Sequence, residues 1–103
     1  MKIIQKLSDF ITDEIEGAKC YIKMAIENKD EHRELSDTLY DISTQEMNHV
    51  NILHGQVVNI IEEYRKTKGE PPAEMMFVYE YLHKKQIEAA NRVKVYQQMY
   101  KGL

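Results

Sequence analysis

The sequence predicts an all-α fold, a bundle of three antiparallel helices. Only four glycines and two prolines occur in 103 residues, and half of these six breaking residues fall within positions 69–72. No alternating run of β-branched residues is bounded by turn residues, so strand signals are absent. Long uninterrupted stretches joined by short polar segments are typical of helical bundles.

The first helix is predicted over residues 2–28, where apolar residues recur at helical spacing. It ends at the polar run 28–33, which is the weaker of two breaks. The second helix is predicted over 33–67, because the sequence Gly-Glu-Pro-Pro at 69–72 cannot continue it. The third helix is predicted over 72–101. The chain, residues 1–103, has the usual length of one domain, so a single domain is expected.

Composition limits the classes of function. With 43% apolar and 30% charged residues, the chain is typical of a folded helical protein. Its net charge of −3 favours neither nucleic acid nor an anionic membrane as a partner. Cys20 is the single cysteine, which excludes an internal disulfide or a C-x-x-C metal site and favours a reducing, cytoplasmic setting. We expect neither a signal peptide nor a membrane span.

Acidic residues fall among the apolar residues of the first two helices. At about 100° per residue, Glu14 and Glu46 lie within apolar stripes, and His49 lies within about 60° of Glu46. The first stripe is Leu7, Phe10, Ile11, Ala18, Tyr21, Ile22 and Ala25. The second stripe is Leu35, Leu39, Ile42, Val50, Leu53, Val57, Ile60 and Tyr64. A buried carboxylate is costly unless it is paired or binds a metal ion.

The spacing of these residues favours the metal ion. Glu46 and His49 are separated by three residues and so project from one helical face. Glu14 lies seventeen residues before Glu31, in the middle of the first break, and Glu46 lies fifteen after it, so an antiparallel hairpin places both at nearly the same height. Carboxylate and imidazole together suit iron, manganese or zinc. The sequence therefore predicts a metal site at Glu14, Glu46 and His49.

Two segments resemble the metal-binding helices of rubrerythrin and its ferritin-like relatives. Residues 14–25, EIEGAKCYIKMA, are similar to the first of these helices, in which a ligand glutamate is followed by a tyrosine seven residues later and an alanine eleven residues later. Residues 46–49, EMNH, match the Glu-x-x-His of the second. The resemblance covers roughly residues 8–64. It implies a di-iron centre, with manganese as an alternative, that handles Fe(II), oxygen or peroxide through a separate electron donor.

The chain departs from that family because it has no fourth helix, whereas a complete site uses ligands from four helices. One solution is a homodimer or higher homo-oligomer, in which two hairpins form the bundle and each supplies Glu14, Glu46 and His49. The other uses Glu88, which lies in the apolar arc of the third helix with Tyr81, Val95 and Met99. The first solution supplies the more complete ligand set and is favoured here.

Structural interpretations remain open beside the metal site. In the first interpretation, Glu46 and His49 form an acid–base pair inside a helical core. In the second, Glu88 pairs with Arg92 one turn later. If both hold, the chain is a metal-free helical assembly protein. A second Glu-x-x-His, Glu80–His83, lies towards the proline-rich break and is not expected to join the centre.

Overall fold

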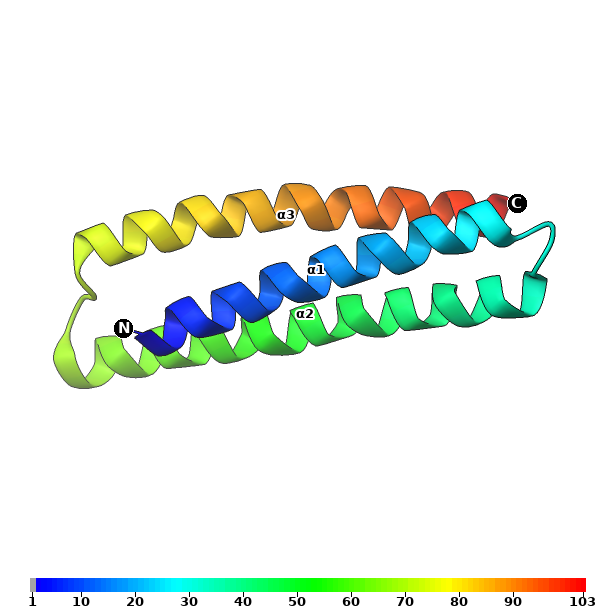
Figure 1. The fold of residues 1–103 in the computed structure, drawn as a ribbon. Coiled ribbons are helices and arrows are strands. Elements are labelled where there is room, and N and C mark those ends of the chain that lie inside the picture. Colours follow the sequence, from blue (N-terminus) through cyan, green and yellow to red (C-terminus); the bar gives the residue numbers. More distant parts are fainter. Residues whose placement is uncertain (1) are drawn as a thin grey trace.

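The computed structural model describes residues 2–103 and contains three helices. α1 spans Lys2–Asn28, α2 spans Arg33–Lys68 and α3 spans Ala73–Gly102. Each bound lies within one residue of the prediction, and residues 2–103 contain no strand, so the all-α class is confirmed. The helices form a rod of 56 × 19 × 18 Å in which consecutive helices run antiparallel and α1 lies between α2 and α3 (Figure 1).

The break between α2 and α3 is set by backbone chemistry. Gly69 ends α2 with a φ of 86°, a left-handed conformation that glycine adopts without steric cost. Pro71 is buried and Pro72 immediately precedes α3, where a missing backbone N–H costs nothing. Glu34 in the first turn of α2 and three basic residues in its last turn also complement the helix dipole.

A continuous row of small and aliphatic residues joins α1 to α2. On α1 the buried residues alternate in steps of four and three, the spacing that keeps one row against a neighbouring helix. These residues are Ile4, Ser8, Ile11, Ile15, Ala18, Ile22 and Ala25. The buried residues of α2 are Ser36, Leu39, Ser43, Val50, Val57 and Ile61. Small serines bring the helices close, and the Ser43 hydroxyl donates to the Ala18 carbonyl at 2.8 Å.

The predicted stripes were partly wrong. Phe10 is 53% exposed, Leu35 is 44% exposed and Tyr21 is 37% exposed, although all three were expected in the core. On α1 the apolar arc is wide enough for two parallel rows, and α2 and α3 bury only one of them. The row that contains Phe10 and Tyr21 lies on the opposite flank from α3 and remains open.

α3 is attached by the buried Val93, which joins the apolar cluster of α1 and α2, and by polar and aromatic groups. The buried Gln86 amide donates to the Ser8 carbonyl at 3.0 Å and to the Thr12 hydroxyl at 3.1 Å, which ties α3 to α1. Near the other end, the Tyr100 ring stacks on Tyr40 of α2 with centroids 5.0 Å apart. Within residues 2–103, no helix combines the length and apolar character needed to cross a membrane.

Candidate metal centre

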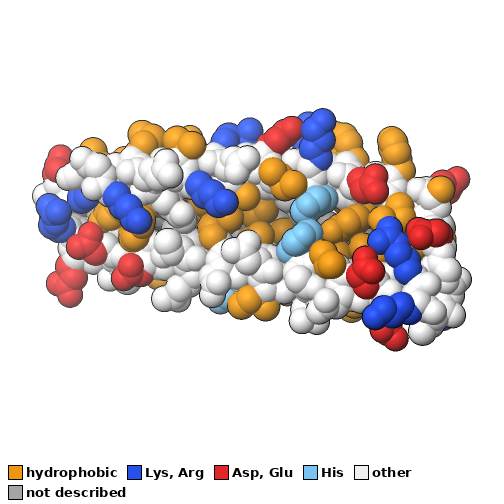
Figure 2. Space-filling view, turned by 180° about the vertical axis from the view of Figure 1, so that it is seen from behind, with side chains coloured by type: hydrophobic (Ala, Val, Ile, Leu, Met, Phe, Trp, Pro, Cys, Tyr) orange, Lys and Arg blue, Asp and Glu red, His pale blue; other side chains and the backbone are white. Residues whose placement is uncertain are grey.

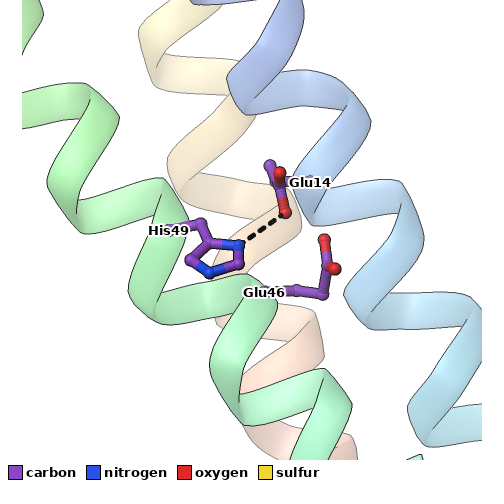
Figure 3. A group of neighbouring side chains, drawn as sticks. All are labelled: Glu14, Glu46 and His49. Carbon is purple, nitrogen blue, oxygen red and sulfur yellow. Dashed lines mark hydrogen bonds and ion pairs between the residues drawn. The ribbon is translucent and has the colours of Figure 1, made fainter.

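Glu14, Glu46 and His49 lie together midway along the α1–α2 hairpin (Figure 3). Each offers one ligand atom, and these atoms all lie within 4.8 Å of one another. His49 Nδ1 is 3.4 Å from Glu14 Oε2, an ion-pair distance when the imidazole is protonated. The structure therefore brings together three side chains from two helices, separated by up to 35 residues in sequence.

The three side chains lie at the edge of the helix interface and not in its centre. The Glu14 side chain is 28% exposed and that of His49 is 51% exposed, while Glu46 is half-buried. Figure 3 shows α3 behind the hairpin, on the side away from these groups. The sequence predicts side chains turned into a packed interior, whereas this cluster opens onto a surface that α3 leaves uncovered.

Apolar residues surround the cluster on this surface, here named the α1–α2 face. Its exposed members are Ile3, Phe10, Tyr21, Met24 and Leu35. Its half-buried members are Leu7, Ile42, Leu53 and Ile60. Most of these residues recur at intervals of three, four or seven, so Glu14 and Glu46 occupy central positions in rows that are otherwise mostly apolar.

The electrostatics of the cluster disfavour two negative charges. A hydrogen bond with the Glu14 carboxyl group raises the pKa of Glu46, and burial and the Glu14 charge raise it further, while His49 acts in the opposite direction. Two carboxylates this close repel each other when both ionise, so one of them retains its proton to a higher pH. A divalent cation between them would remove that repulsion.

Gly17 lies against the Glu46 carboxylate. A Cβ at position 17 would lie 3.4 Å from Glu46 Oε2, in direct contact. Glycine in a helix interior costs about 1 kcal/mol relative to alanine, yet Gly17 lies well inside a 27-residue helix. The sequence pattern alone does not identify this contact, since Gly55 is also an interior glycine and nothing lies within 4 Å of its added Cβ.

The donor set fits one divalent cation per chain. Ligand atoms bound at about 2.1 Å from a common ion lie about 3 to 4 Å apart, so the atoms of this cluster need only small side-chain adjustments. Two carboxylates and one imidazole match the preferences of iron, manganese and zinc. Three protein ligands leave coordination positions open, and the exposure of His49 keeps the cluster accessible from solvent.

Glu88 is not part of this cluster. It lies on α3 with its side chain 46% exposed, and its carboxylate is 3.9 Å from Lys85 Nζ. Its expected neighbours Tyr81, Val95 and Met99 are 52–57% exposed, so the prediction that this arc faces the bundle interior is wrong. The predicted pairing of Glu88 with Arg92 is also not observed, because the nearest charged partner of Glu88 is Lys85.

The second Glu-x-x-His also lies elsewhere. The His83 ring stacks on His54 with centroids 4.5 Å apart and an angle of 3° between the rings, which links α3 to α2. Figure 2 shows histidine side chains bridging a hollow lined by hydrophobic groups on this side of the molecule. Burial and the neighbouring His54 lower the pKa of His83, which favours its neutral form.

Comparison with known proteins gives no further guide, since no protein-family model, curated protein or solved structure matches the chain.

Proposed function

We propose that the protein binds divalent iron or manganese through Glu14, Glu46 and His49. The observation that carries this proposal is the convergence of the three ligand atoms within 4.8 Å on the α1–α2 face. The raised pKa of Glu46 supports it, because a carboxyl group that gains from neutralisation by a proton also gains from a cation.

A second copy of the chain completes the site in this proposal. Three side chains are too few for two metal ions, but two copies facing each other supply four carboxylates and two imidazoles, the composition of a di-iron carboxylate centre. Pairing over the α1–α2 face would also cover exposed apolar side chains such as Phe10, which is 53% exposed. The ferritin-like bundle is then made of two hairpins, with α3 outside it.

The proposed activity is oxidation of Fe(II) or reduction of peroxide. When bound at this site, a pair of Fe(II) ions would supply electrons to oxygen or peroxide. Glu14 and Glu46 balance the positive charge, and His49 contributes a neutral ligand at the solvent-accessible edge. For peroxide reduction, the electrons come from a separate donor protein, because the chain has no C-x-x-C iron site of its own.

The competing function is metal-free assembly. It is favoured by the exposed apolar residues of α3, among them Phe77 at 74% exposure, which have no place in a metal centre. The two functions differ in one measurable property. A metal-binding protein gains stability from its ion through ligand linkage, whereas an assembly protein is indifferent to ion and chelator.

The decisive experiment is an anaerobic titration of the apoprotein with Fe(II), followed by admission of air. We expect saturable binding at one ion per chain, an increase in oligomer mass with binding, and absorbance of oxidised iron after oxygen is admitted. Glu46→Gln and His49→Gln should each abolish binding, because they remove one ligand and leave the fold intact.

Two matched controls lie away from the cluster. Glu16→Gln and His32→Gln alter an exposed glutamate and an exposed histidine of the same helical hairpin. Both should bind Fe(II) like the unaltered protein. Absence of binding in the unaltered protein, or equal binding by the site and control variants, would leave the assembly function as the better account.

A further inference from the structure

The side of α3 that faces away from α1 carries an unusual set of exposed residues. Its apolar members are Phe77 at 74%, Leu103 at 62%, Tyr81 at 57%, Val95 at 55% and Met99 at 52% exposure. Lys85, Glu88 and Arg92 lie between the two apolar ends, and all three are exposed. At about 100° per residue the positions up to Met99 share one side of α3, and Leu103 directly follows the helix, which ends at Gly102. They are named the α3 outer face.

The spacing within this face is that of a helix-pairing seam. Tyr81, Lys85, Glu88, Arg92, Val95 and Met99 follow one another in alternating steps of four and three. That alternation keeps a row of residues against a second helix over several turns. No other helix within residues 2–103 covers this row, so any helix that packs against it belongs to another molecule.

The charges at the centre of the face identify that partner. Glu88 contacts Lys85 at the long distance of 3.9 Å, and Arg92 forms no ion pair within the part of the chain that the structure describes. An antiparallel copy of the same helix, related by a two-fold axis near position 90, places Glu88 opposite Arg92 of the second copy and Arg92 opposite its Glu88. Both central charges then gain a partner.

The same axis matches the apolar ends. It places Tyr81 opposite Met99 of the second copy and Phe77 opposite its Leu103, while the Lys85 stem lies along its Val95. We infer that the α3 outer face binds a second copy of this chain, antiparallel and in this register. The contact is isologous, as in most homodimers, because one surface contacts the same surface of its partner.

Other arrangements of two copies are less favourable. A parallel pair in register places Glu88 against Glu88 and Arg92 against Arg92, which is repulsive. An antiparallel pair shifted by one heptad still places Lys85 opposite Glu88. It leaves Met99 against Glu74, however, and Leu103 uncovered. Only the axis near position 90 satisfies the charges and covers both apolar ends.

This contact is distinct from the pairing proposed for the metal centre. It uses α3 alone and involves none of Glu14, Glu46 and His49, so its formation does not depend on metal binding. If both contacts form, each chain touches two neighbours through different faces.

Disulfide cross-linking tests the register. In a Cys20→Ser background, Tyr81→Cys and Met99→Cys lie about 27 Å apart along one helix, too far to join within a chain. We expect this double variant to form a covalent dimer on mild oxidation in the presence of chelator, and neither single-cysteine variant to do so. A covalent dimer of Tyr81→Cys alone would indicate parallel pairing and overturn the inference, as would absence of any cross-link.

Charge reversal tests the central pair in the same double-cysteine background. Glu88→Arg or Arg92→Glu places like charges opposite each other twice per dimer, so each should slow cross-linking on the order of tenfold. An equal mixture of the two variants should cross-link at the original rate as a mixed dimer, because positions 88 and 92 then again carry opposite charges across the axis. An effect within the helix itself cannot be rescued by mixing.

A control reversal lies on another side of the same helix. Glu80→Arg changes an exposed glutamate outside the α3 outer face and should leave the rate unchanged. Equal slowing by this control, or no recovery in the mixture, would overturn the assignment of Glu88 and Arg92 as partners across the two-fold axis.

Discussion

α1 and α2 meet along a continuous row of aliphatic and small residues, whereas α3 adds a short apolar contact around Val93 and is otherwise attached at separate points by amide, aromatic and imidazole groups. The first contact depends on apolar burial along most of the hairpin. The second depends on groups such as Gln86, Tyr100 and His83, whose hydrogen bonds and ring contacts require particular geometry or protonation. The hairpin that carries Glu14, Glu46 and His49 is thus expected to resist changes that loosen α3.

The largest expected effect is on the buried row of α1, where Ile22 packs with Leu39 of α2 and Tyr100 of α3. Ile22→Ala empties a fully buried position, since Ile22 has no exposed surface, and should reduce the free energy of unfolding by about 3 kcal/mol. Chemical denaturation monitored by circular dichroism measures the loss. The matched control is Ile3→Ala on the same helix, where the side chain is already 50% exposed and little should change. Similar losses for both would contradict an aliphatic core centred on the hairpin.

A slightly smaller effect is expected from metal. Mn(II) at a hundredfold excess over its Kd should stabilise the protein by about 2.7 kcal/mol, and chelation should remove that gain. Hydrogen exchange should slow at the centre of α1 and α2 and remain unchanged in α3. Uniform slowing across all three helices would show that Mn(II) stabilises the attachment of α3 as much as the α1–α2 contact.

Glu46→Gln is expected to stabilise the apoprotein and at the same time to abolish Mn(II) binding. The pKa of Glu46 is raised, so the unfolded carboxyl group loses its proton near the ordinary 4.5 while the folded one retains it to higher pH. Stability of the apoprotein therefore falls as the pH rises through that interval. The variant removes this loss, so at pH 7 it should be more stable than the unaltered apoprotein and insensitive to Mn(II). Thermal unfolding with and without metal measures both properties.

Two interior glycines offer a comparison within the hairpin. Gly55→Ala should stabilise α2 by about 1 kcal/mol, because nothing lies within 4 Å of the added Cβ. Gly17→Ala should give a similar gain in the apoprotein but weaken Mn(II) binding on the order of tenfold, because its Cβ contacts Glu46 Oε2. Calorimetric titration distinguishes the two variants. Equal affinities would show that Gly17 has no part in positioning the ligand.

Much of the fold could be predicted from the sequence, because its determinants are local. Gly69, Pro71 and Pro72 set the main break, and the lengths on either side of the first break bring Glu14 to the height of Glu46. The side of each helix that α3 covers could not be predicted in the same way. Phe10 and Tyr81 lie in apolar arcs typical of a core, yet both remain exposed, since periodicity does not reveal which part of a wide arc a neighbour will cover.

Acid should loosen α3 before it affects the hairpin. Burial and the neighbouring His54 hold the pKa of His83 below its ordinary value of 6.5, so the unfolded chain takes up a proton first as the pH falls through 6.5. Because the unfolded state then binds more protons, the contribution of His83 to stability is present above that pH and is lost below it. Hydrogen-exchange protection, taken relative to the slower intrinsic exchange at low pH, should therefore fall between pH 7 and pH 5 more in α3 than in α1. His83→Phe keeps an aromatic ring against His54 without the titration, so it should reduce this loss of protection. An unchanged pH response in that variant would place the acid-sensitive group elsewhere.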